Sequence, residues 1–275
     1  MPDLQHPQCS TVVNTATEAL TWRPVGRGGT LFRCAIQVTL VQPHQTPAGG
    51  AQMESYEGLL DVLAQELHNV EQVFRGLSGA DWQARTQLRP LDPELPHWTV
   101  FELAGHFDVS LGLTRALIAG RGEDRPARDR TSFFINPRSE TAPVVYEYAY
   151  TMVADRTTDK MADVLHETFS RVVAESRAMG PDTVGPGYFA PMRLDEFVAS
   201  RVVEAVVHGL DLTQALGRDP ITTLPGLTLT AAILDDLLAR RTVGTRPADL
   251  ADDRVWVVAA SGRAAHPDNR LPLIG

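Results

Sequence analysis

The sequence predicts an all-α protein: a bundle of four long amphipathic helices, one further helix and a short tail. Apolar residues recur three and four positions apart through most of the chain after residue 53, which is the spacing of one face of a helix. Turns rich in glycine and proline separate these stretches. One stretch near residue 204 also places a carboxylate and an imidazole on the same helix face, which suggests a site inside the bundle.

Composition limits the classes of protein that the chain can belong to. It has 275 residues, of which 43% are hydrophobic and 21% charged, as in soluble globular proteins with a sizeable core. A formal net charge of −9 argues against nucleic acid or an anionic membrane as the main partner. The apolar runs are too short for a membrane-spanning helix. Because Cys9 and Cys34 are the only cysteines, we expect no disulfide framework, no cysteine metal site and a reducing, cytoplasmic location.

Residues 1–52 differ from the rest of the chain. They hold both cysteines, only five charged residues and no sustained helical period. They contain a strand-like run over 35–41, and they lack the basic start and uninterrupted apolar run of a secretory signal. We therefore expect a disordered extension over 1–52, which a start codon assigned too far upstream would explain. A helical bundle over 53–245 and a short tail over 246–275 are expected to follow.

The first two long helices are predicted over 54–77 and from about 99 to 119. Each carries an apolar stripe at helical spacing. Thr99 is the expected N-cap of the second helix, with Glu102 as its capping-box partner. His106 lies between two stripe positions of this helix, so we expect its side chain to point into the bundle.

The middle of the chain is less regular. A polar stretch over 121–140 carries five arginines, and a solvated connection is favoured there over an anion-binding loop. These arginines are Arg121, Arg125, Arg128, Arg130 and Arg138. A short helix is predicted over 143–155 and a long one over 159–178. His68 and His166 flank the stripes of their helices, so we expect both at the surface rather than as ligands.

The fourth long helix, from about residue 191 or 193 to residue 216, carries the clearest chemical signal. Glu204 and His208 lie four residues apart, so their side chains share one largely apolar face. Burying a carboxylate and an imidazole costs free energy unless partners satisfy them, and a divalent metal would do so. Together with His106 they give two histidines and one carboxylate with an open position, a set that suits zinc. The alternative is that the three side chains are simply paired with one another in the core.

The end of the chain is predicted to hold one more helix, over 228–241. The run over 254–263 is rich in valine and is predicted to form one strand and a turn.

Two motifs resemble a known family. Residues 98–106 read Trp-Thr-Val-Phe-Glu-Leu-Ala-Gly-His, which is similar to the GWTVxDLxAHL segment of the mycothiol-dependent maleylpyruvate isomerase family. Residues 201–217 resemble its RxxExxVHxWDLAxALG segment and keep the Arg, Glu, His and Asp and the closing Ala-Leu-Gly. The resemblance covers roughly residues 54–241, with both motifs in the family's order.

The resemblance implies a DinB-like four-helix bundle that binds a divalent metal. The family's metal ligands carry over onto His106, Glu204 and His208, and mycothiol, a low-molecular-weight thiol, is implied as the co-substrate. The sequence departs from the second motif where Gly209-Leu210 stands after the histidine and the family has a tryptophan. This departure is expected to alter how tightly the pocket is closed.

Two further residues are candidates for roles near the metal. Asp211, three residues after His208, could orient that ligand; a salt bridge to Arg201 or Arg218 is the alternative. The family's characterised isomerase has a sizeable C-terminal domain that contributes to the active site, whereas about 34 residues follow the last long helix here. In this tail Arg263 is the candidate for binding a cofactor or substrate, through a substrate carboxylate.

We therefore expect a metal-dependent enzyme of low-molecular-weight thiol chemistry. The metal would stabilise a thiolate, which would add to a small electrophilic substrate and give either S-transfer or cis–trans isomerisation. No cysteine occurs after residue 52, which fits an external thiol. A non-catalytic metal-binding bundle and a helical interaction protein are the alternatives. The sequence identifies neither the catalytic residues nor the electrophile, and it leaves a homodimer as an open option.

Overall fold

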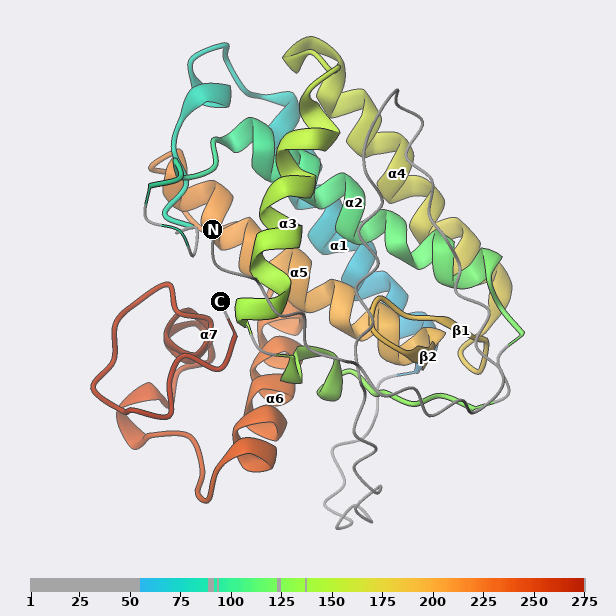
Figure 1. The fold of residues 1–275 in the computed structure, drawn as a ribbon, viewed down its shortest axis with the longest axis vertical. Coiled ribbons are helices and arrows are strands. Elements are labelled where there is room, and N and C mark those ends of the chain that lie inside the picture. The colour runs from blue at the N-terminus through green and yellow to red at the C-terminus, as the bar shows by residue number, and fades with distance from the viewer. Residues whose placement is uncertain (1–54, 89–91, 93, 123–124, 137, 275) are drawn as a thin grey trace, which may run out of the picture. The chain divides into compact units, whose positions relative to one another are not determined.

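The computed structural model describes residues 55–88, 92, 94–122, 125–136 and 138–274. The described chain is mainly helical, as predicted, with two short strands (Figure 1). The extension predicted over 1–52, with its strand-like run and both cysteines, lies outside the described residues. Within the part of the chain that the structure describes, no helix is both long enough and apolar enough to cross a membrane.

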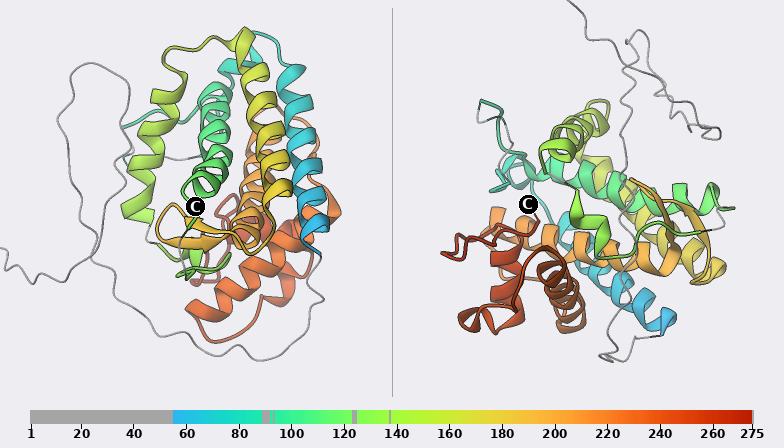
Figure 2. Two further views of the ribbon diagram at one scale, coloured as in Figure 1. Left: turned by 90° about the vertical axis from the view of Figure 1, so that its right-hand side faces the viewer. Right: turned by 60° about the horizontal axis from the view of Figure 1, so that its bottom comes forward.

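Four long helices form the predicted bundle. They are α1 (Tyr56–Arg75), α2 (Val100–Ala119), α4 (Thr158–Met179) and α5 (Leu194–Ala215). Helix α1 packs against α4 and α5, and α2 packs against the same two helices, so the four close into a ring. The side view in Figure 2 shows α1, α2 and α4 standing side by side. The DinB-like bundle expected from the sequence is therefore confirmed.

The sequence sets the point at which α2 begins, and this helix carries His106. Thr99 is the N-cap: its side-chain oxygen accepts hydrogen bonds from the backbone N–H groups of Phe101 and Glu102. The Glu102 carboxylate in turn accepts the Thr99 backbone N–H at 2.6 Å. This reciprocal capping box is the one that the sequence predicted, and it fixes the first turn of α2.

Helix α5 lies at the centre of the molecule. It contacts α1, α2 and α6, and 17 of its 22 residues are buried. Its buried side chains form much of the core together with inward residues of α1 and α2, such as Leu63 and Leu111. A helix packed on nearly all sides holds its polar side chains in fixed positions, because they have few ways to reach solvent. Glu204 and His208 both belong to this helix.

Helix α3 (Arg138–Val153) packs beside α2 on the outside of the bundle (Figure 2). The short helix expected here is confirmed, but it begins five residues earlier than predicted and contains Pro143 within it. Pro143 lies in the second turn of the helix, where a proline removes one backbone hydrogen bond. A helix can accommodate this loss close to its start. Helix α3 matters because it borders the site described below.

Short elements connect the long helices. Strands β1 (Val184–Pro186) and β2 (Pro191–Arg193) pair antiparallel, with Gly185 opposite Met192, where the sequence predicted only a turn-rich loop. Three short 3₁₀ segments also occur. They are η1 (Asp81–Gln83), η2 (Ser132–Ile135) and η3 (Ala248–Leu250).

The C-terminal part contains α6 (Leu224–Arg241) and α7 (Asp253–Ala260), which pack together beyond one end of the bundle (Figure 1). The strand predicted over 254–263 is therefore wrong. Asp252 caps the helix by accepting the backbone N–H of Val255. Trp256 is fully buried, and its ring nitrogen donates to the Ala231 carbonyl of α6 at 3.3 Å. Packing against α6 thus outweighs the strand preference of the valines.

Removing the α2 cap is expected to destabilise the fold measurably. Thr99→Ala should lower the free energy of unfolding by about 1 kcal/mol, because it leaves backbone N–H groups of the first turn without an acceptor. Urea unfolding of the full chain measures this loss. Thr99→Ser is the matched control and should retain most of the stability; an equal loss in both variants would assign the effect to packing of the threonine methyl group.

Candidate metal centre

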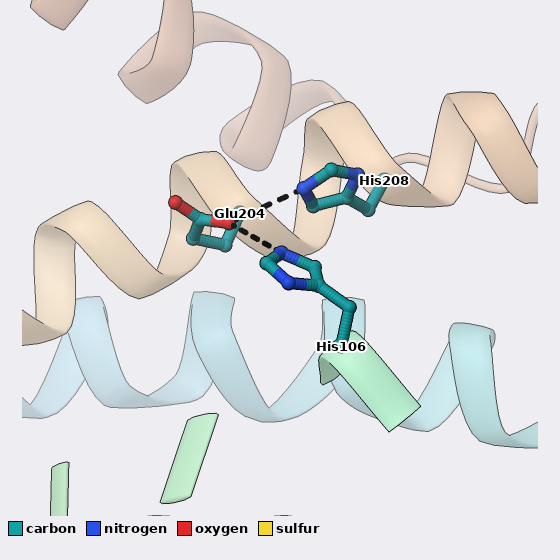
Figure 3. Close-up of side chains that lie close together, drawn as sticks. All are labelled: His106, Glu204 and His208. Carbon is teal, nitrogen blue, oxygen red and sulfur yellow. Dashed lines mark hydrogen bonds and ion pairs between the residues drawn. The ribbon is translucent and has the colours of Figure 1, made fainter. Parts of the chain in front are cut away.

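Three side chains from two helices meet inside the bundle. His106 comes from α2, and Glu204 and His208 come from successive turns of α5, so all three point toward one another (Figure 3). Glu204 Oε2 lies 3.4 Å from His106 Nε2 and 3.3 Å from His208 Nε2. One ligand atom from each of the three residues lies within 4.8 Å of the other two. The structure therefore brings together all three residues that the sequence predicted as ligands.

The geometry fits a single divalent metal ion. Two ligand atoms that are each about 2.1 Å from a tetrahedral ion lie about 3.4 Å from each other. The two separations from Glu204 match this value. Two neutral imidazoles and one carboxylate are also a donor set typical of zinc and its divalent neighbours. Among the described residues no fourth His, Cys, Asp or Glu belongs to this group, which leaves room for an exogenous ligand.

The three side chains are largely shielded from solvent. Side-chain exposure is 12% for each histidine and 17% for Glu204. The two imidazole rings meet edge to face, with their centroids 4.6 Å apart, and Trp98 lies against the other side of His106 at 5.3 Å. Because packed rings surround them, the imidazoles have few alternative orientations.

The surroundings favour an ionised Glu204. Burial alone would raise the pKa of this carboxyl group, but hydrogen bonds from the two histidines and the charge of Arg201 hold it well below its ordinary value. Burial lowers the pKa of His106, and a positive charge on His208 would lower it further. An ionised carboxylate and a neutral His106 are the protonation states that a metal ion requires.

Asp211 holds His208 from behind. Its Oδ2 atom lies 2.8 Å from His208 Nδ1. Burial would raise the pKa of Asp211, but the charge of Arg263 and the hydrogen bond from His208 lower it to about 2. An ionised carboxylate can only accept, so Nδ1 of His208 carries a proton, and Nε2 is the ring nitrogen that faces Glu204 and could bind a metal. The sequence suggested that Asp211 could orient His208, and this hydrogen bond is such a contact. It favours the tautomer that a metal-binding histidine needs.

The ion-pair partner of Asp211 is Arg263, not Arg201 or Arg218. Arg263 Nε and Nη2 donate to the two carboxylate oxygens at 3.0 and 2.7 Å. Arg218 instead lies 3.5 Å from Asp81. Arg263 therefore has a protein partner for its charge, although it lines the same cavity as the triad. This pairing does not favour the sequence expectation that Arg263 meets a substrate carboxylate.

Arg201 is the other buried cation of the site. Its side chain is 1% exposed and lies between the rings of Phe133 and Phe197, with Cζ 4.8 and 4.6 Å from their centroids. Nη1 donates to the Ser110 carbonyl at 2.8 Å. Nη2 lies 3.9 Å from the Oε1 atom of Glu204, which is the oxygen that faces away from the histidines. Arg201 thus balances the charge of Glu204 and fixes its orientation.

The triad faces a large cavity of about 1100 Å³. His106, Glu204 and His208 form part of its wall, together with residues of α3, η2, the β1–β2 turn and the segment after α7. Sequence analysis did not identify these other walls, because they come from segments far apart in the chain. Leu210, which stands where the family motif has a tryptophan, is buried in the core and does not line the cavity.

Two other histidines and two of the arginines considered in the sequence belong neither to the triad nor to the lining of its cavity. His68 is exposed, and His166 is 55% exposed and pairs with Glu71. In the 121–140 stretch, Arg130 pairs with Glu196 of α5 at 2.8 Å, and Arg128 donates to Asn136 at 2.9 Å. Arg130 therefore attaches the connection to α5, and Arg128 links two parts of the connection to each other.

Comparison with known proteins gives one match. The sequence model described as mycothiol maleylpyruvate isomerase N-terminal domain matches residues 63–213, which is more than half of the chain. The matched range includes His106, Glu204 and His208. No curated protein and no solved structure matches the chain.

Removing the carboxylate behind His208 is expected to weaken metal binding. Asp211→Asn should raise the dissociation constant for zinc by about 10- to 100-fold, because Nδ1 of His208 would lose the partner that fixes its tautomer. Competition with a chromophoric chelator measures the change. Asp249→Asn, which breaks the separate pair with His266 at 3.1 Å, is the matched control and should leave zinc affinity unchanged. Equal affinities in all three proteins would contradict the orienting role.

Metal affinity is also expected to fall as the pH falls. Burial would lower the pKa of His208, but its contacts with Asp211 and Glu204 raise it above the ordinary value of 6.5. Protons therefore compete with the metal at a higher pH than for an unperturbed histidine, and affinity should be full only above that raised pKa. Zinc titrations between about pH 5.5 and 8 test this sign. Affinity that is constant across the range would contradict it.

Proposed function

The chain belongs to the mycothiol maleylpyruvate isomerase N-terminal domain family, and on that premise we propose that it is a metal-dependent enzyme of low-molecular-weight thiol chemistry. His106, Glu204 and His208 hold a divalent metal, zinc by the chemistry of the donor set. Mycothiol is the co-substrate, and the second substrate is an electrophile. The observation that carries this proposal is the meeting of three ligand atoms within 4.8 Å at the wall of a large cavity.

A metal bound at this triad supplies a Lewis acid that lowers the pKa of a thiol toward neutrality. The reaction itself begins when the thiol loses its proton and the sulfur bonds to the electrophilic carbon. In S-transfer a leaving group departs or a proton adds to the neighbouring carbon. In cis–trans isomerisation the former carbon–carbon double bond, now a single bond, rotates. The carbon–sulfur bond then breaks, which releases the thiolate and forms the double bond again.

The protein's own residues prepare the site for this chemistry. Asp211 holds the proton on Nδ1 of His208 and so keeps Nε2 free to act as a ligand. Arg263 fixes Asp211, and Arg201 fixes the outer oxygen of Glu204. Aromatic side chains line much of the cavity, and a wall of low polarity strengthens charge interactions beside it.

The cavity favours an enzyme over a structural metal site. Structural zinc sites are normally closed by four protein ligands, whereas catalytic sites keep a position open. Three ligands beside a cavity of about 1100 Å³ match the second case. The non-catalytic metal-binding bundle is therefore the less favoured alternative.

The metal assignment can be tested directly. Protein purified without a chelator is expected to contain about one divalent metal ion per chain, measured by elemental analysis. His106→Ala and His208→Ala should each lose most of it. His166→Ala is the matched control, because it removes a histidine that is also paired with a glutamate but lies at the surface. An unmutated protein that neither contains zinc nor takes it up would overturn the proposal.

The thiol assignment needs a separate measurement. Metal-loaded protein is expected to gain thermal stability with mycothiol but not with its S-methyl derivative, because only the free thiol can deprotonate. Mass spectrometry should then detect either a thioether with a test electrophile or an isomerised product. Metal-loaded protein with no response to the free thiol would leave the metal site standing and reject the thiol chemistry.

A further inference from the structure

The cavity beside the triad has two chemically different walls. Helix α5, together with Arg263 after α7, contributes charged groups, whereas α3, η2 and the β1–β2 turn contribute mainly apolar and aromatic side chains. Small-molecule sites usually measure about 300–1000 Å³. At about 1100 Å³ this cavity has room for a thiol and a second bulky molecule together.

Several apolar side chains on the second wall are exposed. Among the described residues, eight large hydrophobic side chains are classed as exposed, and three of them line this cavity. These are Ile135, Tyr148 and Tyr188, which are 44%, 43% and 38% exposed. They come from η2, from α3 and from the β1–β2 turn, so three separate segments present apolar surface to one space. Apolar surface gathered in this way marks a binding site for an apolar ligand.

The arginines of the cavity differ in how their charges are balanced. Arg201 lies 3.9 Å from Glu204, and Arg263 pairs with Asp211 at 2.7 Å. Neither is therefore a free cation that could hold a carboxylate of a small diacid. Arg241 is different.

Arg241 is exposed at the cavity wall and has no carboxylate within ion-pair distance among the described residues. Its Nη2 atom donates to the Phe134 carbonyl at 2.6 Å, and Nη1 donates to the Leu273 carbonyl. These neutral acceptors hold the guanidinium in place without cancelling its charge. Donors thus remain for an anionic group of a ligand.

We propose that the electrophile is a bulky, largely apolar molecule with one anionic group. Its apolar body lies against Ile135, Tyr148 and Tyr188, and its anionic group pairs with Arg241. This inference rests on the proposed function for the reaction, but the binding that it describes needs neither metal nor thiol. A small dicarboxylate fits this wall less well, because most of its surface is charged and would be desolvated against aromatic rings.

Two fluorescent probes of nearly the same shape test the proposal. Anilinonaphthalene sulfonate carries one anionic group, and phenylnaphthylamine is its uncharged counterpart. The full-length protein is expected to bind both, and the sulfonate more tightly. Arg241→Gln should weaken the sulfonate about tenfold, which is the effect of losing one charge-assisted contact, and leave the uncharged probe unchanged. Arg240→Gln is the matched control, because Arg240 pairs with Asp129 and does not line the cavity.

The apolar wall is tested with the same probes. Tyr148→Ser should weaken both of them about fivefold through lost apolar contact. Leu224→Ser should weaken neither, because Leu224 is 74% exposed but does not line the cavity. Circular dichroism on each variant establishes that the fold is retained.

Three results would overturn the inference. One is no binding of either probe, and another is an Arg241→Gln variant that affects both probes equally or neither. The third is displacement of both probes by maleate at a lower concentration than by an aromatic monocarboxylate.

Failure of the proposed function would look different. A protein that binds both probes as expected but takes up no metal would retain this ligand site and lose the thiol chemistry. A metal-loaded, thiol-responsive protein that binds neither probe would lose only this inference.

Discussion

The burial of an ionised Glu204 between two imidazoles is the interaction on which the rest of the structure depends. A lone carboxylate on a helix packed as fully as α5 would be strongly destabilising, so the surrounding elements must satisfy it. Helix α2 brings His106 to the inner oxygen, and Arg201 lies near the outer one. The closed ring of four helices is what holds these groups at fixed distances. The fold thus surrounds the buried negative charge of Glu204, which would be strongly destabilising without a nearby cation or a full set of hydrogen bonds.

The segment that follows the last bundle helix belongs to this arrangement. Arg263 reaches back over 52 positions to Asp211, and Arg241 donates to the Leu273 carbonyl. Backbone hydrogen bonds from Leu273 and Ile274 to the Ala260 carbonyl hold the end of the described chain against α7. The segment after α7 supplies part of the cavity wall, including Arg263 and Leu273.

Much of the fold and the three central residues could be predicted from the sequence, because the signals are local. Apolar periodicity identified the long helices, and the spacing of Thr99 and Glu102 identified the cap of α2. The partner of Asp211 could not be predicted, since an ion pair across 52 residues leaves no local pattern. Helix α7 was missed because its valines favour a strand in isolation, although Asp252 was an available capping signal. The cavity walls come from separate segments and depend on tertiary packing alone.

The division of the cavity into a polar and an apolar wall follows from the same constraint. The charges of Glu204 and Asp211 need partners, so Arg201 and Arg263 are held by them and by carbonyl groups. Polar groups near the triad are therefore occupied by the protein itself. The other wall of the cavity is mainly apolar. Of the described arginines that line the cavity, Arg241 is the one whose charge no carboxylate of the described residues balances, so the proposed selectivity for a second molecule is assigned to this side. The proposed function thus assigns the type of reaction to the triad, and the further inference assigns the choice of the second molecule to the wall formed by α3, η2 and the β1–β2 turn.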